Sequence, residues 1–268
     1  LETMRNFSLS IRCLLLFFVV VTSLVNVSLA LLSEETGFSY NETTGRGPSK
    51  WGDLNPKWAK CKKGKMQTPI NIALTSVVVD NTLGKLYTRH RPALANATRT
   101  EHGLMIAYRG NAGYIVVNGT KYNFLQLHWH WNSEHSVNNS TGDLELHLVH
   151  SSGKALAVIG IIYKIGLSDP LLSMILTKVG NMSKTEATRD IGVLSHELIQ
   201  YDKNLYFRYM GSLTTPPCSE GVLWTVIKKT RTVSKYQLDA LKTFNQERYI
   251  STARPVMPLN GRIVRVSG

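Results

Sequence analysis

The chain has 268 residues, 43% of them hydrophobic, so it can bury a substantial core in one large domain or two small ones. Its formal net charge of +13 permits attraction to acidic surfaces and polyanions, but no basic helix, zinc finger or RNA-binding motif accompanies that charge. The composition therefore argues against a nucleic-acid partner.

The first thirty residues are typical of a secretory signal peptide. Arg5 and Arg12 precede the apolar run 13–21, and Ser28-Leu29-Ala30 supplies the small residues that a signal peptidase requires. A retained membrane anchor is the alternative, although four polar residues interrupt the apolar stretch between residues 13 and 32. We expect a signal peptide at 1–30 and a single domain at 31–268 with no stable membrane span. The protein would be secreted to an apoplast-like compartment, or reach a vacuole or plastid by the secretory route.

Two cysteines, Cys61 and Cys218, remain once Cys13 leaves with the signal. An even pair in an oxidising compartment is expected to form a disulfide, and two buried free thiols are the alternative. Six Asn-x-Ser/Thr sequons accompany the signal and indicate a glycoprotein. The candidate acceptors are Asn41, Asn96, Asn118, Asn138, Asn139 and Asn181.

Residues 31–68 show little periodicity, and we expect them to form an irregular arm over a core. The lysine cluster at 57–65 within this arm is interpreted as a solvated loop rather than a binding site. Beyond it, short β-rich runs alternate with turn signals, and Asn118-Gly119 predicts a tight hairpin turn. The expected strands are 104–108, 113–117, 122–131, 144–150, 155–163, 205–210 and 222–228.

Helix signals are confined to two segments, 171–179 after Ser168-Asp169-Pro170 and 234–247 with apolar residues at 3–4 spacing. We therefore predict a mostly β (α+β) domain. It is built on a large, mainly antiparallel, twisted central sheet with a few short surface helices.

Three histidines carry the chemistry that the sequence predicts. His128 and His130 alternate within an apolar run, so their imidazoles share one face of a strand, and His147 lies on a second strand. Three imidazoles with an open fourth position are typical of a catalytic zinc site, whereas structural sites close with a fourth ligand. The spacing predicts chemistry on zinc-bound water.

Polar residues beside these histidines strengthen the metal interpretation. Gln126 precedes His128 by two residues, and Glu145 precedes His147 by two, so each shares a strand face with its histidine. Metal-binding imidazoles need such a partner on the other ring nitrogen. An inward carboxylate on an apolar strand is costly unless it is paired, whereas a lone inward histidine is usually a satisfied core residue. The combination favours a metal site.

The chain from about Phe38 to Arg262 resembles the α-class carbonic anhydrases, especially the secreted plant branch that includes dioscorins and nectar proteins. The motifs are Gln67-x-Pro69-Ile70, Gln-Leu-His-Trp-His, Ser-Glu-His, Glu-Leu-His-Leu-Val-His, Gly-Ser-Leu-Thr-Thr-Pro-Pro-Cys and Arg254-Pro255. Their order and approximate spacing are those of the family.

The resemblance implies roles for the matching positions. His128, His130 and His147 would hold Zn²⁺, and Thr214 would accept a hydrogen bond from zinc-bound hydroxide while donating one to Glu134. Thr215 would line the polar side of the site. Four further residues match the apolar pocket that positions carbon dioxide about 3 Å from the nucleophile. They are Val149, Val158, Leu213 and Trp224, each of which could equally be ordinary core.

The implied reaction is the reversible hydration of carbon dioxide to bicarbonate and a proton. A histidine is the natural proton carrier, because its pKa lies near the working pH. By resemblance that carrier is His102, although Thr100 and Met105 replace polar groups that relatives often have nearby, and an ordinary surface histidine is the alternative. No partner beyond this small-molecule substrate is implied, and the oligomeric state is left open.

A dioscorin-like storage or defence glycoprotein with weak or no activity is the alternative function, since it resembles plant carbonic anhydrases over the same length. The intact histidine triad with Glu134 and Thr214 favours catalysis. A serine esterase is disfavoured, because the sequence has no Gly-x-Ser-x-Gly motif.

Overall fold

A sheet of thirteen strands organises the residues that the computed structural model describes, which are 37–183, 185–195, 197–245 and 250–268. Phe38–Gly268 forms one compact unit. The signal-peptide prediction for residues 1–30 lies outside the described residues. Within the described residues, no helix has the length and apolar character to cross a membrane.

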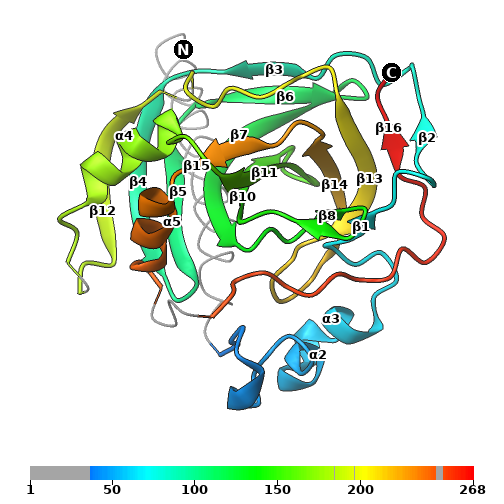
Figure 1. The fold of residues 1–268 in the computed structure, drawn as a ribbon, viewed down its shortest axis with the longest axis horizontal. Helices are drawn as coiled ribbons and strands as arrows, with labels where there is room; N and C mark the ends of the chain where they lie inside the picture. Colours follow the sequence, from blue (N-terminus) through cyan, green and yellow to red (C-terminus); the bar gives the residue numbers. More distant parts are fainter. Residues whose placement is uncertain (1–36, 184, 196, 246–249) are drawn as a thin grey trace, which may run out of the picture. The chain divides into compact units, whose positions relative to one another are not determined.

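The main sheet runs in the order β12-β4-β5-β7-β10-β11-β14-β13-β16-β2, with β6 and β3 branching from β7 and β15 pairing with β11 (Figure 1). Most pairings are antiparallel, as predicted, and β11–β14, β11–β15 and β16–β2 are parallel. The strands are β2 (Val78–Val79), β3 (Tyr87–His90), β4 (Ala93–Thr100), β5 (Gly103–Arg109), β6 (Gly113–Val117), β7 (Thr120–Trp131), β10 (Leu144–Ser151), β11 (Leu156–Ile165), β12 (Thr188–Leu194), β13 (Tyr206–Ser212), β14 (Glu220–Ile227), β15 (Arg231–Val233) and β16 (Arg265–Val266).

A small second sheet pairs β1 (Asn71–Ile72), β8 (Ser136–Val137) and β9 (Ser140–Thr141). All seven strands predicted from the sequence are present; 113–117 matches β6 at both ends, and the ends of the others differ by at most two residues. The two longer strands that the prediction missed are β4 and β12. Their sequences are rich in small and charged residues, so they lack the apolar alternation that marks the others; in β4 the buried side chains are Ala95 and Ala97.

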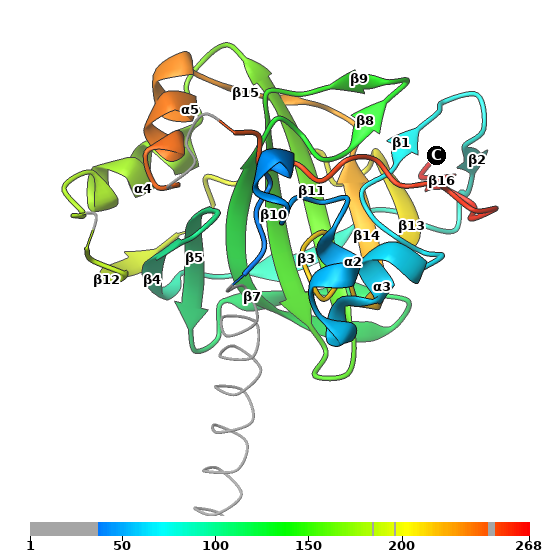
Figure 2. The same cartoon turned by 90° about the horizontal axis from the view of Figure 1, so that it is seen from below.

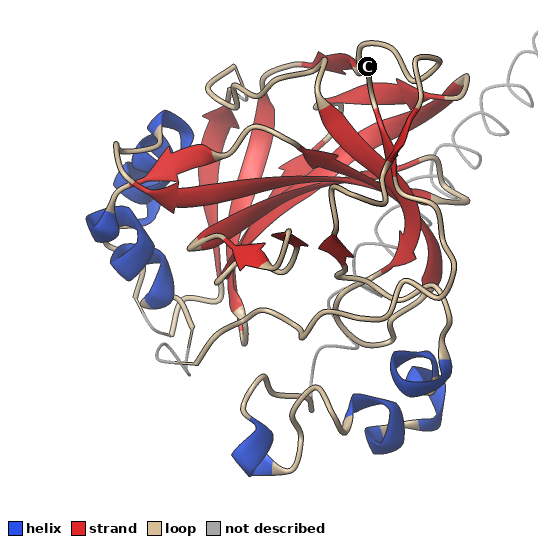
Figure 3. Ribbon diagram, turned by 45° about the vertical axis from the view of Figure 1, so that its right-hand side comes forward, coloured by secondary structure: helices blue, strands red, loops and turns tan. Residues whose placement is uncertain are grey.

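Two helices cover one face of the sheet (Figure 3). The predicted helix 171–179 is confirmed as α4 (Pro170–Val179). The side chain of Asp169 caps its first turn by accepting a hydrogen bond from the Leu172 amide. The prediction for 234–247 is wrong in length: α5 spans Lys235–Lys242 and begins with a capping box at Ser234. After Lys242 the backbone hydrogen bonds tighten to i→i+3 spacing, and residues 246–249 lie outside the described residues.

The faces of the sheet bury two different cores. Leu146 and Leu148 of β10 point into the larger one, together with the apolar sides of α4 and α5. Val149 of the same strand points into the other, with Val158 and Trp224. Since successive residues of a strand alternate between faces, β10 is buried from Leu144 to His150 because both of its sides are covered.

The N-terminal arm is irregular, as predicted, except for short helical turns that the sequence did not indicate. These turns are η1 (Glu42–Thr44), α2 (Trp51–Leu54), η2 (Pro56–Trp58) and α3 (Lys60–Lys63), of which Figure 2 shows α2 and α3 next to each other. Trp51 and Trp58 are buried in a small aromatic core with Phe38. In that core Cys61 is bonded to Cys218, so the expected disulfide is present.

We expect the disulfide to contribute strongly to stability, since it joins residues 157 apart and so restricts a very long loop in the unfolded chain. Replacing both cysteines by serine should lower the free energy of unfolding by about 2–5 kcal/mol, measured by chemical denaturation. The reduced wild type serves as the control and should match the double variant. If the denaturation midpoint of the double variant equals that of the oxidised wild type, the expectation is contradicted.

A second expectation concerns His150, which is fully buried at the end of β10. Its Nδ1–H donates to the carbonyl of Leu148, its Nε2 accepts from Nε2 of His90 at 2.8 Å, and burial lowers its pKa to about 3. Below pH 6.5 the imidazole of His150 therefore binds a proton in the unfolded chain but stays neutral in the folded chain. The stability that the neutral imidazole provides is complete above pH 6.5 and is lost as the pH falls towards 3.

Replacing His150 with asparagine should consequently flatten the pH dependence of unfolding between pH 6 and 4, by up to about 1.4 kcal/mol per pH unit. The comparison is made on metal-free protein, with denaturant unfolding at each pH. If the plots of unfolding free energy against pH are parallel for the variant and the wild type, His150 takes up its proton without unfolding of the chain, and the expectation is contradicted.

Candidate metal centre

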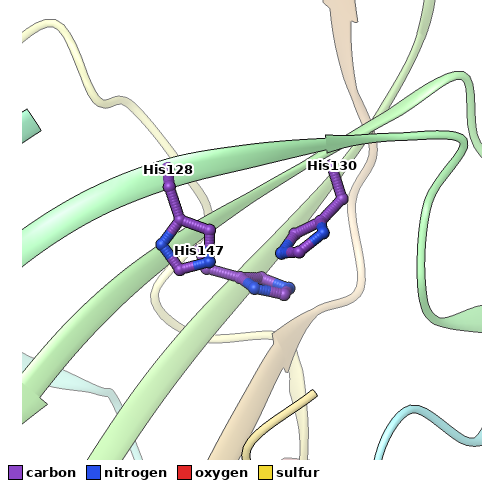
Figure 4. Close-up of side chains that lie close together, drawn as sticks. All are labelled: His128, His130 and His147. Carbon is purple, nitrogen blue, oxygen red and sulfur yellow. The ribbon is translucent and has the colours of Figure 1, made fainter. Parts of the chain in front are cut away.

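The pairing of β7 with β10 brings the three predicted histidines together. His147 stands directly opposite His128, and Glu145 opposite His130, in one antiparallel register. The side chains of directly opposed residues lie on the same face of a sheet, so all three imidazoles project from it together. Figure 4 shows the rings of His128 and His130 on one strand turned towards His147 on its neighbour.

Each imidazole is held by a hydrogen bond on one ring nitrogen. Nδ1–H of His128 donates to Oε1 of Gln126 at 2.8 Å, and Nε2–H of His147 donates to Oε1 of Glu145 at 2.9 Å. Nδ1–H of His130 donates to the backbone carbonyl of Thr252 at 2.7 Å. These bonds fix the tautomer of each ring and leave the other nitrogen free to bind a metal.

The free nitrogens are suited to a cation. One ring nitrogen from each histidine lies within 4.8 Å of those of the other two. Nε2 of His130 is buried and has no hydrogen-bond partner among the described residues, which is costly unless a ligand binds it. Burial lowers the pKa of His128 and His130, so the imidazoles are neutral, as metal ligands must be. The residues present fit a zinc ion.

Glu145 is fully buried, and its charge is stabilised from two sides. Burial acts to raise its pKa, but the charges and hydrogen bonds of His135 and His147 hold the pKa well below its usual value. His135 donates to this carboxylate through Nδ1–H at 2.7 Å and through its backbone N–H at 2.8 Å. Gly160 of β11, which stands opposite His147, leaves room for the carboxylate, because a Cβ there would lie 2.8 Å from Oε1 of Glu145.

Glu134 lies beside the cluster and is also fully buried. Its Oε1 accepts from the backbone N–H of Arg254 at 3.0 Å, while Oε2 is 3.6 Å from Nε2 of His130 and has no hydrogen-bond partner among the described residues. The structure thus does not join Glu134 to Thr214 directly. Thr214 is buried in the loop that follows β13.

The residues expected to form the apolar pocket lie on the same face of the sheet as the histidines. Val149 pairs with Val158, which pairs with Trp224, so the three form a row across β10, β11 and β14. Leu213 packs against this core from the loop after β13. The Trp224 ring lies 4.9 Å from that of His147 and donates its Nε1–H to the carbonyl of Ser212. The neighbouring loop residue Thr215 accepts from the Cys218 amide through its carbonyl.

His102 occupies the two-residue turn between β4 and β5. Its ring stacks on Phe38 with centroids 4.1 Å apart and meets Tyr40 edge-on at 5.3 Å. Burial, together with the charges of His130 and Arg46, lowers its pKa to about 4. In this position the imidazole is neutral at pH 7.

Some residues of the site carried no local signal in the sequence. Thr252 contributes through its backbone, which no side-chain pattern reveals, and Arg254 stands out in the sequence only as part of a family motif. His135 likewise belongs to a family motif, yet it makes hydrogen bonds to Glu145 and to the Tyr209 hydroxyl. The role of Gly160 depends on its position beside the Glu145 carboxylate, which the sequence does not reveal.

Comparisons with known proteins agree with this geometry. The family model described as eukaryotic-type carbonic anhydrase matches residues 46–268. Alpha carbonic anhydrase 7 of Arabidopsis thaliana is 37% identical over 273 residues, 98% of each chain. Dioscorin dioA3 of Dioscorea japonica is 39% identical over 255 residues, 93% of each chain.

A solved structure of dioscorin complexed with ascorbate superposes with a TM-score of 0.82 at 39% identity, covering 86% of this chain and 97% of that one. The resemblance that the sequence motifs indicated is confirmed. The chain belongs to the eukaryotic-type, or α-class, carbonic anhydrases.

Proposed function

We propose that this chain is a zinc-dependent carbonic anhydrase that hydrates carbon dioxide reversibly to bicarbonate and a proton. The observation that carries the proposal is the convergence of three imidazoles, each with its outer nitrogen hydrogen bonded. His128, His130 and His147 would hold the ion. Bound zinc lowers the pKa of a coordinated water to about 7 and so supplies a nucleophile at neutral pH.

The chain's own residues would orient and confine the reactants. Val149, Val158, Leu213 and Trp224 offer an apolar wall that would hold an apolar gas beside the metal centre. Thr214, with Thr215 on the polar side, would orient the nucleophile through its hydroxyl. For that role Thr214 must donate to Glu134, whose buried Oε2 awaits a donor.

His102 would carry the proton to solvent. Stacked on Phe38, with a pKa of about 4, it is a poor acceptor for a proton released near pH 7. The role therefore requires the imidazole to leave the Phe38 ring for water, where its pKa returns towards 6.5.

The secretory route fits the disulfide and gives the sequons a role. Asn118 and Asn139 are the acceptors that the fold exposes best, because both are exposed in turns and their side chains make no hydrogen bond within the described residues. The side-chain oxygens of Asn41, Asn138 and Asn181 accept hydrogen bonds. Asn96 is half-buried within β4, between β12 and β5.

A dioscorin-like storage or defence glycoprotein is the second candidate, since dioscorins are among the similar proteins. The two functions differ in what the metal centre does. The following experiment separates them.

The His130→Ala variant should lose zinc and lower the rate of carbon dioxide hydration by more than about 100-fold, because one of three ligands is removed. Zinc content is measured by elemental analysis and hydration by stopped flow, with and without a sulfonamide. His90→Asn, outside the site, is the control and should keep both properties. If the wild type holds zinc but hydrates carbon dioxide no faster than His130→Ala, the result favours the storage or defence function.

For proton transfer, His102→Ala should slow turnover by about tenfold in weak buffer, and added imidazole should restore the rate. Zinc content and the rate in strong buffer should stay at wild-type values. If turnover in weak buffer is unchanged, another group carries the proton.

A further inference from the structure

The net charge of +13 has no role in the proposed reaction, and part of it gathers on an exposed face of the β3–β6–β7 ribbon. Within the described residues, strand β3 pairs with β6 alone and is therefore an edge strand; Figure 1 shows the two side by side. Tyr114 stands opposite Arg89, and Val116 lies between Tyr87 on one strand and Lys121 on the other. Opposed residues share a face, so tyrosines and cations form one surface.

The two tyrosines provide flat apolar area on this surface. Their ring centroids are 6.4 Å apart with planes tilted by 33°, and Tyr87 is 49% exposed. Nζ of Lys121 lies 4.3 Å from the centre of the Tyr114 ring. The opposite face of the ribbon is buried through Ile115 and Val117. The aromatic rings are therefore not part of the core.

The cations on this surface have no acidic partner within the described residues. Arg89 and Lys121 are exposed and form no ion pair there, and two further exposed cations, Lys85 and Arg91, flank β3 along the chain. Residues 81–133 contain a single acid, Glu101, which lies in the β4–β5 turn. The unpaired cations give the surface a positive potential.

We propose that the surface formed by Tyr87, Arg89, Tyr114 and Lys121 binds an acidic polysaccharide. The carboxylates of a uronate chain pair with Arg89 on the edge strand and Lys121 on β7, and the apolar face of a sugar ring stacks on the exposed ring of Tyr87. The lysine cluster of the arm is a poorer match. Lys62 there is already paired with Asp53, and the tryptophans Trp51 and Trp58 are buried.

The test measures binding of the full mature chain to a polygalacturonate oligosaccharide by calorimetry at low ionic strength. The double variant Arg89→Gln/Lys121→Gln should bind about tenfold more weakly. The matched control Lys50→Gln/Lys63→Gln removes two exposed arm lysines and should change binding less than twofold. Carbon dioxide hydration and thermal unfolding, unchanged in all variants, report that the fold and the metal centre are intact.

A second pair of measurements separates sugar recognition from general attraction to polyanions. Tyr87→Ala should weaken binding to polygalacturonate severalfold but leave binding to polyaspartate, which has no sugar rings, at the wild-type value. Three results would overturn the proposal: absence of binding by the wild type, an equal loss in the Lys50/Lys63 control, or a Tyr87→Ala variant that binds the oligosaccharide as well as the wild type. Since the ribbon is separate from the histidines, inactivity towards carbon dioxide would leave the result unaffected.

Discussion

The register between β7 and β10 is the constraint on which the rest of the site depends. It places His128 against His147 and His130 against Glu145. A slip of one residue would turn either strand's polar side chains into the larger apolar core and its leucines towards the metal centre. Because both faces of β10 are buried, such a slip would bury polar groups without partners. The cores and the metal centre therefore specify the same register.

Burying a carboxylate among these strands is costly, and the structure offsets that cost locally. Glu145 accepts from both His147 and His135, and His135 in turn bonds the hydroxyl of Tyr209. The Tyr209 hydroxyl is also hydrogen bonded to Oγ1 of Thr68 at 3.1 Å, so the chain of hydrogen bonds reaches the N-terminal arm. Every link is buried, which strengthens each interaction and penalises the loss of any one. The orientation of His147 is thus supported by residues distant in sequence.

Sequence predicted those parts of the fold and site whose cause is local. Strand alternation placed Gln126 beside His128 and Glu145 beside His147, because residues two apart share a face. The carbonyl of Thr252, which holds His130, could not be foreseen, since it depends on how a loop more than a hundred residues away returns to β7. Strand β12 was missed for a similar reason. It is an edge strand without regular apolar alternation, and among the residues that the structure describes it pairs with β4 alone.

Strand β7 is long enough to serve two surfaces without coupling them. Along one edge its first residues pair with β6 and its later ones with β5, so the neighbour changes partway along the strand. Phe124 and Leu127, three residues apart, both pack in the larger core, because the register with β10 shifts between them. That irregularity changes which residues point away from the core: Lys121 before it and His128 after it lie on the same side of the sheet, on separate stretches of strand. A charged surface and the metal centre can therefore coexist on one strand, each set by its own neighbours.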